Sequence, residues 1–281
     1  MDETTARGRT GPPEFVEALA KGLAVLRCFD AANPEMTLSE IARRVSLSPA
    51  AARRSLITLI ALGYVGQAGK RFHLKPAVMS LGSAFYFAAR IDELMLPELR
   101  RIVEIFGDAS SVATLDGQDV VYVAHYSTQR ARRATAVVGA RYPAYATSLG
   151  RVLLAGLSDA ELDGYFEAVR PAALTPKTVT SKTELRRLVH EARELGYSTV
   201  VDQLDYGVTA LAAPVRGGDG ATIAAVNSSG YSGMVDADRM VVERLHELRI
   251  AAARIAEATA RYPALASMLG AGESRAPRTS N

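Results

Sequence analysis

The sequence predicts an α+β protein with a small helical module at the N-terminus and a larger domain built on an antiparallel sheet. Three observations support this class. Helical periodicity and capping residues occur three times before residue 64, and a short hairpin pattern follows. Two longer hairpin patterns, at 111–126 and 210–230, are separated by helical segments. Residues 1–75 contain 11 Lys and Arg against 7 Asp and Glu, whereas the rest contain 22 against 23.

The first two helices are defined by periodicity, a proline stop and a capping motif. A helical pattern of apolar residues begins at Glu14 and closes at Asn33-Pro34. The next helix begins at Thr37, which forms a T-x-x-E capping box with Glu40. Its predicted buried stripe consists of Leu38, Ile41, Ala42 and Val45.

A third helix follows after only two residues and leads into a short hairpin. Ser48 is its expected N-cap, and Pro49 occupies the first helical position, where a missing N–H is tolerated. Gly63 ends this helix. The hairpin has its tip near residues 68–69, with Lys70 and Arg71 beside it. Together, these elements describe a winged helix-turn-helix at residues 14–75.

One face of the third helix is predicted to bind DNA. Ala52, Leu56 and Leu59 point inward, which leaves small residues and two arginines on the other face. Small side chains let the backbone approach base edges, arginines contact guanine or phosphate, and wing cations contact the DNA backbone. The predicted set is Thr37, Ser48, Pro49, Ala50, Ala51, Arg53, Arg54, Lys70 and Arg71. The alternative is a solvated helix face on a domain that binds no nucleic acid.

The chain beyond residue 75 divides into a linker and a second domain. Residues 76–91 predict a linker helix whose apolar stripe indicates dimerisation, with packing onto its own large domain as the alternative. Residues 92–265 predict the α+β domain, which is large enough to enclose a small-molecule pocket. Its expected helices lie near 148–156, 159–167, 182–195 and 235–261. A disordered arm is expected at 1–13 and a disordered tail at 266–281.

Composition argues against membrane and secreted classes. No apolar run reaches the roughly 18 residues of a membrane helix, and the N-terminus lacks an apolar signal core. The single cysteine, Cys28, lies in an apolar helical pattern and is expected to be a buried structural thiol. A cytoplasmic protein with no membrane partner is therefore expected.

The motifs give no support for catalysis. The histidines at 73, 125, 190 and 246 lack metal-ligand spacing, and no nucleophile elbow, zinc motif or Walker A sequence is present. The glycine-rich segment 217–220 lies between two strands and predicts a hairpin turn. We therefore expect no catalytic residue, metal or cofactor, and no enzyme activity. The alternative is an enzyme or ligand-carrier domain with a vestigial DNA-binding head.

Two long segments carry a resemblance to a known family. They read LSEIARRVSLSPAAARRSLITLIALGYV and GARYPAYATSLGRVLLAGL, and a wing and linker helix lie between them. Over residues 15–265 the chain resembles the IclR family of bacterial transcriptional regulators. Its AAARR and YPAYATSLGRVLLA segments are most similar to the branch that regulates protocatechuate and 4-hydroxybenzoate catabolism, the β-ketoadipate pathway.

This resemblance implies an architecture, partners and a function. It implies a winged helix-turn-helix, a linker helix and a GAF-like effector domain. It also implies homodimers, often paired into tetramers, that bind palindromic operators in double-stranded DNA. The implied function is transcriptional control of catabolic genes, in response to a small aromatic or dicarboxylic acid or a pathway intermediate.

The resemblance also maps a set of effector-binding residues. It places Thr147, Ser148 and Leu149 at a helix N-terminus, whose free N–H groups favour a carboxylate. Val200 stands where the family often has aspartate, and Ala210 replaces a frequent polar or cysteine position, so the pocket suits an aromatic ring. Tyr142 is expected to stack on that ring, with Arg133 or Arg141 supplying charge unless these arginines are solvated or at an interface. The predicted set is Tyr142, Thr147, Ser148, Leu149, Val200, Ala210, Asn227, Ser229 and Arg133.

Overall fold

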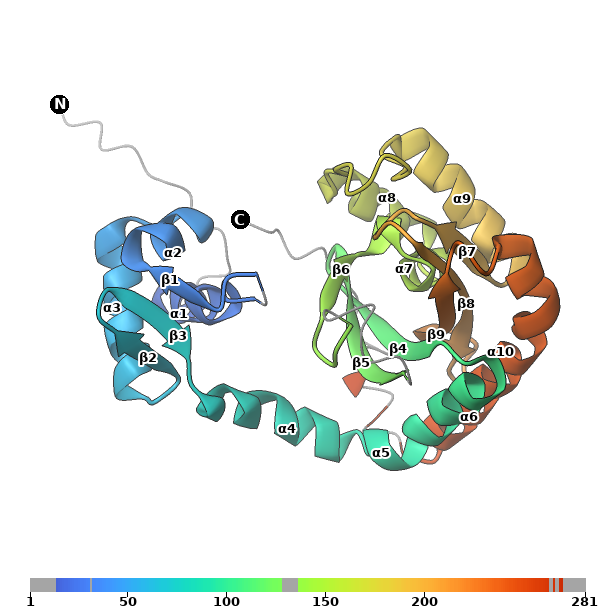
Figure 1. Ribbon diagram of the computed structural model, residues 1–281, viewed down its shortest axis with the longest axis horizontal. Coiled ribbons are helices and arrows are strands. Elements are labelled where there is room, and N and C mark those ends of the chain that lie inside the picture. The colour runs from blue at the N-terminus through green and yellow to red at the C-terminus, as the bar shows by residue number, and fades with distance from the viewer. Residues whose placement is uncertain (1–13, 31, 128–135, 263–264, 266–267, 270–281) are drawn as a thin grey trace. The chain divides into compact units, whose positions relative to one another are not determined.

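The computed structural model describes residues 14–262 apart from 31 and 128–135, together with 265, 268 and 269. The chain divides into two compact units between Ser83 and Ala84. We call these the N-terminal unit and the C-terminal unit (Figure 1). The arm expected at 1–13 and the tail residues 270–281 lie outside the described residues. Within the described part of the chain, no helix is both long and apolar enough to cross a membrane.

The N-terminal unit contains three helices and a three-stranded antiparallel sheet with strand order β1-β3-β2. Its elements are α1 (Glu17–Arg27), β1 (Glu35–Thr37), α2 (Leu38–Arg44), α3 (Pro49–Ala61), β2 (Val65–Ala68) and β3 (Arg71–Leu74). The predicted helices and hairpin are confirmed, and β1 extends the wing by pairing Met36 with Phe72. Buried side chains from all three helices form one core, which includes Val25, Ile41 and Leu56.

Capping residues position the helices of this unit. The Thr37 side chain accepts a hydrogen bond from the Glu40 amide, and the Glu40 carboxylate accepts one from the Thr37 amide at 2.7 Å. Ser48 Oγ accepts from the Ala51 amide at 3.2 Å. Between these helices Ser46 adopts a φ of 50° and turns the chain. The local signals in the sequence therefore set the helix-turn-helix geometry.

Two further features of this unit concern buried and exposed apolar groups. Cys28 is buried, its Sγ donates to the Val25 carbonyl at 3.1 Å, and burial raises the pKa of the thiol to about 11. This agrees with the expected structural role of Cys28.

Helix α1 begins at Glu17 rather than Glu14, and Phe15, Leu19 and Leu23 are exposed.

The linker region is a series of short helices rather than the single helix predicted at 76–91. It consists of a 3₁₀ turn at Pro76–Val78, α4 (Met79–Ala88), α5 (Ile91–Leu94) and α6 (Leu96–Phe106). Arg90, with φ of 48°, breaks the chain direction between α4 and α5. No residue of α4 is buried, although Phe85 packs partly against the core of the C-terminal unit.

The C-terminal unit is built on a six-stranded, fully antiparallel sheet with strand order β6-β5-β4-β9-β8-β7. Its strands are β4 (Ala109–Asp116), β5 (Asp119–Ser127), β6 (Arg141–Pro143), β7 (Ser198–Val201), β8 (Val208–Arg216) and β9 (Thr222–Tyr231). The two predicted hairpins are β4–β5 and β8–β9, and Gly117 supplies the positive φ of the first turn. The sequence did not predict the edge strands β6 and β7.

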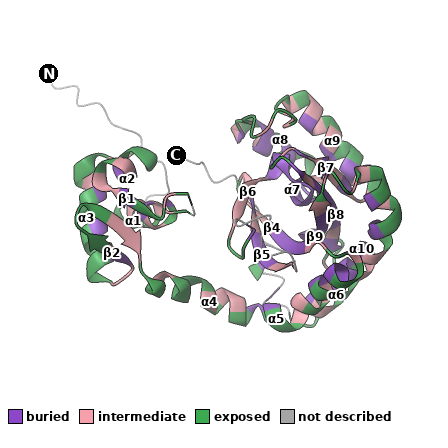
Figure 2. Cartoon of the chain, viewed as in Figure 1, coloured by how far each residue is buried: buried purple, intermediate pink, exposed green. Residues whose placement is uncertain are grey.

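Helices cover the two faces of this sheet, and buried residues concentrate between the layers (Figure 2). One face packs against α5, α6 and α10 (Ala237–Ala260). The other packs against a 3₁₀ turn at Ala144–Ala146, α7 (Ser148–Ala155), α8 (Asp159–Ala168) and α9 (Lys182–Leu195). Leu265 and Leu269 are buried in the α10-side core, so packed chain extends past the domain end expected at residue 265.

Candidate DNA-binding surface and small-molecule cavity

The predicted recognition face of α3 is exposed. Arg53 and Arg54 are exposed, whereas Ala52 and Leu56 on the opposite side are buried at 0% and 1% accessibility. No described carboxylate forms an ion pair with either arginine. The other predicted positions at the helix start, Ser48, Pro49, Ala50 and Ala51, are exposed or half-exposed. The helix therefore presents two unneutralised cations beside a surface of small side chains.

Of the remaining predicted DNA-binding residues, some have exposed polar groups and others use them in hydrogen bonds within the protein. Lys70 is exposed in the wing turn, next to Gly69 with its φ of 59°. Arg71 instead donates from Nη1 to the Glu35 carbonyl on β1 at 3.2 Å. The Thr37 hydroxyl is engaged with the Glu40 carboxylate at 2.9 Å. Lys70 thus forms no bond with the described residues, whereas Arg71 and Thr37 carry structural hydrogen bonds.

Six of the nine predicted effector residues surround one small cavity of about 20 Å³ in the C-terminal unit, which we call the inner cavity. They are Thr147, Ser148, Leu149, Val200, Ala210 and Asn227. Strand register explains part of this convergence, because Val200 pairs with Ala210 and Ala210 pairs with Ser229 across β7, β8 and β9. Residues paired in register project on the same side of a sheet.

The N-terminus of α7 forms the polar end of the inner cavity. Thr147 Oγ1 caps the helix by accepting from the Gly150 amide at 2.9 Å. Ser148 is 1% exposed, and its buried Oγ has no hydrogen-bond partner among the described residues. Gly150 permits a close approach, because an added Cβ would lie 2.1 Å from the Ala144 carbonyl oxygen. A helix N-terminus with an unpartnered hydroxyl is suited to bind an anionic oxygen.

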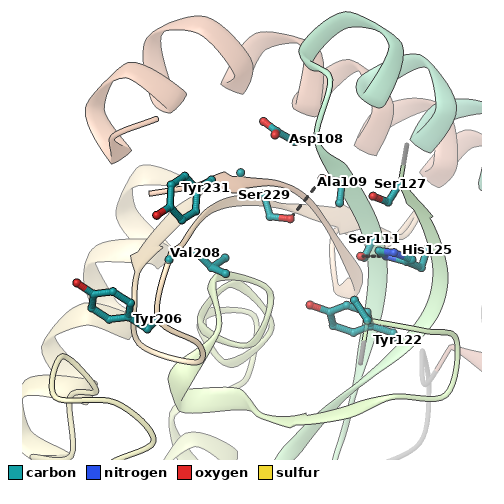
Figure 3. Close-up of a pocket in the computed structure, with 13 residues that line it drawn as sticks. Asp108, Ala109, Ser111, Tyr122, His125, Ser127, Tyr206, Val208, Ser229 and Tyr231 are labelled. Carbon is teal, nitrogen blue, oxygen red and sulfur yellow. Dashed lines mark hydrogen bonds between the residues drawn. The ribbon is translucent and has the colours of Figure 1, made fainter. Parts of the chain in front are cut away.

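A second cavity of about 230 Å³, which we call the outer cavity, adjoins the inner one. Tyr122 and Val208 line both cavities. In Figure 3, Ser111 and His125 lie on one wall, whereas Tyr206 and Tyr231 lie on the opposite wall. Ser229, the seventh predicted residue, also lines the outer cavity. The inner cavity has mainly apolar walls, whereas carboxylate, hydroxyl, imidazole and tyrosine side chains line the outer cavity, and small-molecule sites combine both kinds of group.

Tyr142 and the alternative arginine, Arg141, do not line either cavity. Tyr142 packs edge-to-face on Tyr122, with ring centroids 5.1 Å apart, and so supports the cavity wall from behind. Arg141 donates to the carboxylates of Asp116 at 2.6 Å and Asp119 at 3.3 Å, which corrects the expectation that it supplies charge to a ligand. Arg133 lies outside the described residues.

Seven polar or aromatic residues that line the outer cavity escaped the sequence prediction: Asp108, Ser111, Tyr122, His125, Ser127, Tyr206 and Tyr231. Ser111 and His125 are opposite each other on β4 and β5 only because the register shifts by one residue between Val112 and Ala113. Counting back from the turn at Asp116 without this bulge pairs Ser111 with Ala124 and turns His125 to the other face. Because a bulge has no clear local signal, the hairpin pattern could not identify this pair.

The loop between β7 and β8 closes one side of the combined cavity. Leu204 lines the inner cavity and Tyr206 the outer one. Asp202 holds this loop, because its Oδ1 accepts from the Gly207 amide at 2.7 Å and its Oδ2 from Lys177 Nζ at 2.8 Å. Lys177 is the main cause that lowers the pKa of Asp202 to about 2.

An unusual buried cation also holds this loop. Arg151 of α7 is 2% exposed, and its Nη2 donates to Gln203 Oε1 at 2.6 Å. Burial lowers the pKa of this guanidinium to about 10. No described carboxylate lies within ion-pair distance of it. The α7 helix therefore contacts both the cavity, through Ser148, and the loop that closes it.

A winged helix-turn-helix joined to a cavity-bearing α+β unit defines the class of DNA-binding regulators with a separate small-molecule domain. Residues 18–69 match the IclR helix-turn-helix domain, and residues 87–257 match the bacterial transcriptional regulator IclR C-terminal domain. The chain belongs to the IclR family, as the sequence segments indicate.

Individual relatives extend this finding. The chain is 34% identical over 246 residues to the Pca regulon regulatory protein of Pseudomonas putida, covering 87% of this chain and 84% of the relative. It is 30% identical to the p-hydroxybenzoate hydroxylase transcriptional activator of Acinetobacter baylyi, covering 84% and 89%. Its structure is similar to that of an IclR homologue from Microbacterium hydrocarbonoxydans complexed with 4-hydroxybenzoate. That match has a TM-score of 0.70 and 26% identity, covering 87% and 99%.

Proposed function

We propose that this protein is a transcriptional regulator that binds a small aromatic acid in its C-terminal unit and controls genes of aromatic catabolism. One observation carries the proposal: residues from α7, β7, β8 and β9 converge on a cavity with apolar walls and a helix N-terminus at its polar end. The relatives named as regulators of the Pca regulon and of p-hydroxybenzoate hydroxylase support the same pathway class.

The acid binds with its carboxylate in the inner cavity and its ring in the outer one. The N–H groups of Ser148 and Leu149 in the first turn of α7 lack intrahelical acceptors, and no described residue bonds to the Ser148 hydroxyl, so these groups donate to the carboxylate. Val200 and Ala210 carry no charge that would repel this anion. Tyr122 and Val208, which line both cavities, contact the ring.

The N-terminal unit binds double-stranded DNA through α3 and the wing. Arg53 and Arg54 contact base edges in the major groove, and Lys70 contacts phosphates. The protein acts as a homodimer joined through the linker region, so that two α3 helices contact the half-sites of a palindromic operator. Those half-sites lie about 10 bp apart, or a multiple of that distance, centre to centre.

The two binding events are coupled through the relative stability of two arrangements of the dimer. An aromatic acid that binds one arrangement more tightly shifts the population toward it, and the DNA-binding units change their spacing or orientation as a result. Whether this shift strengthens or weakens operator binding decides between activation and repression.

A mobility-shift experiment with the DNA upstream of the protein's own gene tests this function. We expect a sequence-selective complex at moderate salt whose affinity changes when 4-hydroxybenzoate is added. Inserting 5 bp between half-sites should greatly weaken the complex, because it moves them to opposite sides of the helix. A complex that random DNA competes away equally well would contradict the regulator function and favour a ligand carrier with a vestigial DNA-binding head.

A further inference from the structure

A buried positive charge lies one helical turn from the polar end of the inner cavity. Arg151 is three residues from Ser148 on α7, and residues at this spacing lie on the same face of a helix. Long side chains on a helix lean toward its N-terminus, which is the end of α7 that lines the inner cavity. The guanidinium bonds to Gln203, whose chain neighbour Leu204 lines the same cavity. Arg151 itself does not line the cavity, so its charge acts on this space from behind the wall.

No carboxylate within the described part of the chain pairs with Arg151. Its Nη2 donates to a neutral acceptor, Gln203 Oε1, at 2.6 Å, and its buried Nε has no hydrogen-bond partner among the described residues. Glu184 and Glu191 of α9 attract it from a distance, but both are exposed and form ion pairs with Arg187, at 2.8 and 3.1 Å. Burial lowers the pKa of Arg151 to about 10, so the guanidinium remains charged at neutral pH.

An unbalanced buried charge affects what the neighbouring cavity binds. Buried ions in proteins are normally paired, because desolvation of an isolated charge costs more than a neutral hydrogen bond returns. An anionic ligand in the inner cavity supplies the missing negative charge. In an effective dielectric of about 20, a unit charge at about 10 Å changes a binding constant by roughly tenfold. The field of Arg151 adds to that of the α7 N-terminus, whose partial charge has the same sign.

We propose that Arg151 determines the charge selectivity of the inner cavity: its buried guanidinium favours an anionic ligand through its field, without contacting that ligand. This inference rests on the proposed function, which places a carboxylate at the N-terminus of α7. It gives the charge of Arg151 a role that packing does not require, because a neutral side chain of similar volume fills the same space. Gln203 contributes by its neutrality, since a carboxylate at this position would cancel the charge.

Two substitutions of Gln203 separate this charge effect from a role in holding the loop. Its Oε1 accepts from Arg151 and, at 3.4 Å, from the Val179 amide, so a glutamate can keep both bonds. In isothermal titration of the full-length protein, Gln203→Glu should bind 4-hydroxybenzoate about tenfold more weakly, because the new carboxylate neutralises Arg151. Gln203→Met is the matched control: it lacks the bond but leaves the charge, so its affinity should stay within about threefold of that of the unsubstituted protein.

The melting temperature without ligand shows whether these substitutions disturb the fold. Gln203→Glu should melt at or above the temperature of the unsubstituted protein, because a carboxylate makes a stronger bond to a guanidinium than an amide does. Equal losses of affinity in both variants would assign Gln203 to holding the loop and overturn the inference. Unchanged affinity in Gln203→Glu would overturn it as well. Absence of binding by the unsubstituted protein would overturn the proposed function, and the inference with it.

Substitutions of Arg151 itself provide an independent test, which decides the question if Gln203→Glu does not fold. Arg151→Met keeps most of the volume and removes the charge, so it should weaken 4-hydroxybenzoate binding about tenfold. Arg151→Lys keeps the charge and should retain most of the affinity. Because salt screens buried charges little, the difference between the two variants should persist at high ionic strength. Equal affinities of the lysine and methionine variants would contradict the assignment.

Discussion

The cations of the N-terminal unit differ in the chemistry open to them. Arg53 and Arg54 project from a helix whose neighbouring side chains are small, so their planar guanidinium groups can lie in the plane of a base pair. Lys70 lies in the wing turn, where a compact ammonium group meets phosphates. Arg71 is held by the Glu35 carbonyl and stabilises the wing sheet. The proposed function therefore assigns two kinds of DNA contact to separate residues.

Single substitutions should separate these roles. Arg53→Ala should reduce affinity for the operator by about 1–3 kcal/mol and relax the preference at one base pair. Lys70→Ala should weaken binding to all sequences alike and lower the slope of log affinity against log salt by about one. Fluorescence anisotropy with operator and single-base variants at several salt concentrations measures both effects. The division of roles is wrong if the two variants lose affinity in the same, sequence-independent way.

Arg151 is a buried cation, and no carboxylate among the described residues pairs with it. Desolvation opposes its charge, and only Gln203 receives a hydrogen bond from the guanidinium among the described residues. The methylene stem still fills space between α7 and its neighbours. Arg151 should therefore stabilise the fold mainly because its side chain fills space in the core, rather than through its charge.

This view predicts unequal effects of two substitutions at residue 151. Arg151→Met keeps most of the volume and removes the buried charge, so it should change the free energy of unfolding by less than about 1 kcal/mol. Arg151→Ala leaves a cavity and should lower that free energy by about 2–4 kcal/mol. Urea unfolding followed by circular dichroism measures both, with the exposed Arg187→Met as control. A methionine variant as unstable as the alanine variant would show that the Gln203 bond dominates.

At the scale of elements, the loop at residues 202–207 depends on one carboxylate. Asp202 is 4% exposed and adopts a φ of 55°. Besides Lys177 and Gly207, it accepts from the Ser232 hydroxyl at 2.8 Å. The loop supplies Leu204 and Tyr206 to the cavity, so its position depends on bonds that require an ionised carboxylate.

This dependence predicts a pH effect. The folded-state pKa of Asp202, about 2, lies below its ordinary value of 3.8, so ionised Asp202 stabilises the folded state. The difference corresponds to about 2 kcal/mol, present above pH 4 and lost as the pH falls toward 2. Asp202→Asn should lower the unfolding free energy at pH 7 and flatten its decline between pH 4 and 2. Parallel pH profiles for both proteins would contradict this role.

At the scale of the whole molecule, the two units have separate hydrophobic cores. Only the segment from Pro76 to Ala88 joins the wing to the C-terminal unit along the chain. In the proposed mechanism, a ligand in the cavity influences DNA binding by favouring one arrangement of the dimer. Thermodynamic linkage requires the coupling between ligand binding and DNA binding to be reciprocal.

This reciprocity predicts that each ligand changes the affinity for the other by the same factor, which two independent measurements can check. The factor by which saturating 4-hydroxybenzoate changes operator affinity should equal the factor by which saturating operator changes 4-hydroxybenzoate affinity. Factors of about 5–150 are typical of coupled sites. Anisotropy measures the first quantity and calorimetry the second, with random DNA of equal length as control. Unequal factors would exclude a simple two-site linkage within this protein.

The sequence by itself determined most of the helices, the two central hairpins and the segment that forms the polar end of the inner cavity. The capping residues Thr37 and Ser48, the turn at Gly117 and the segment around Ser148 act locally, so their geometry follows from a few neighbouring residues. Helical periodicity likewise placed α7, α8, α9 and α10 within a few residues of their observed ends.

Only the tertiary structure decided that Ser111, Tyr122 and His125 also face the cavity. The edge strands β6 and β7 are short and form through pairing with β5 and β8. Arg141 is unavailable to a ligand because Asp116 and Asp119 bind it across the hairpin. His125 reaches Ser111 because of a one-residue bulge, and such a shift in register reverses every side chain beyond it. These features arise from pairing between strands, which no single segment of the sequence specifies.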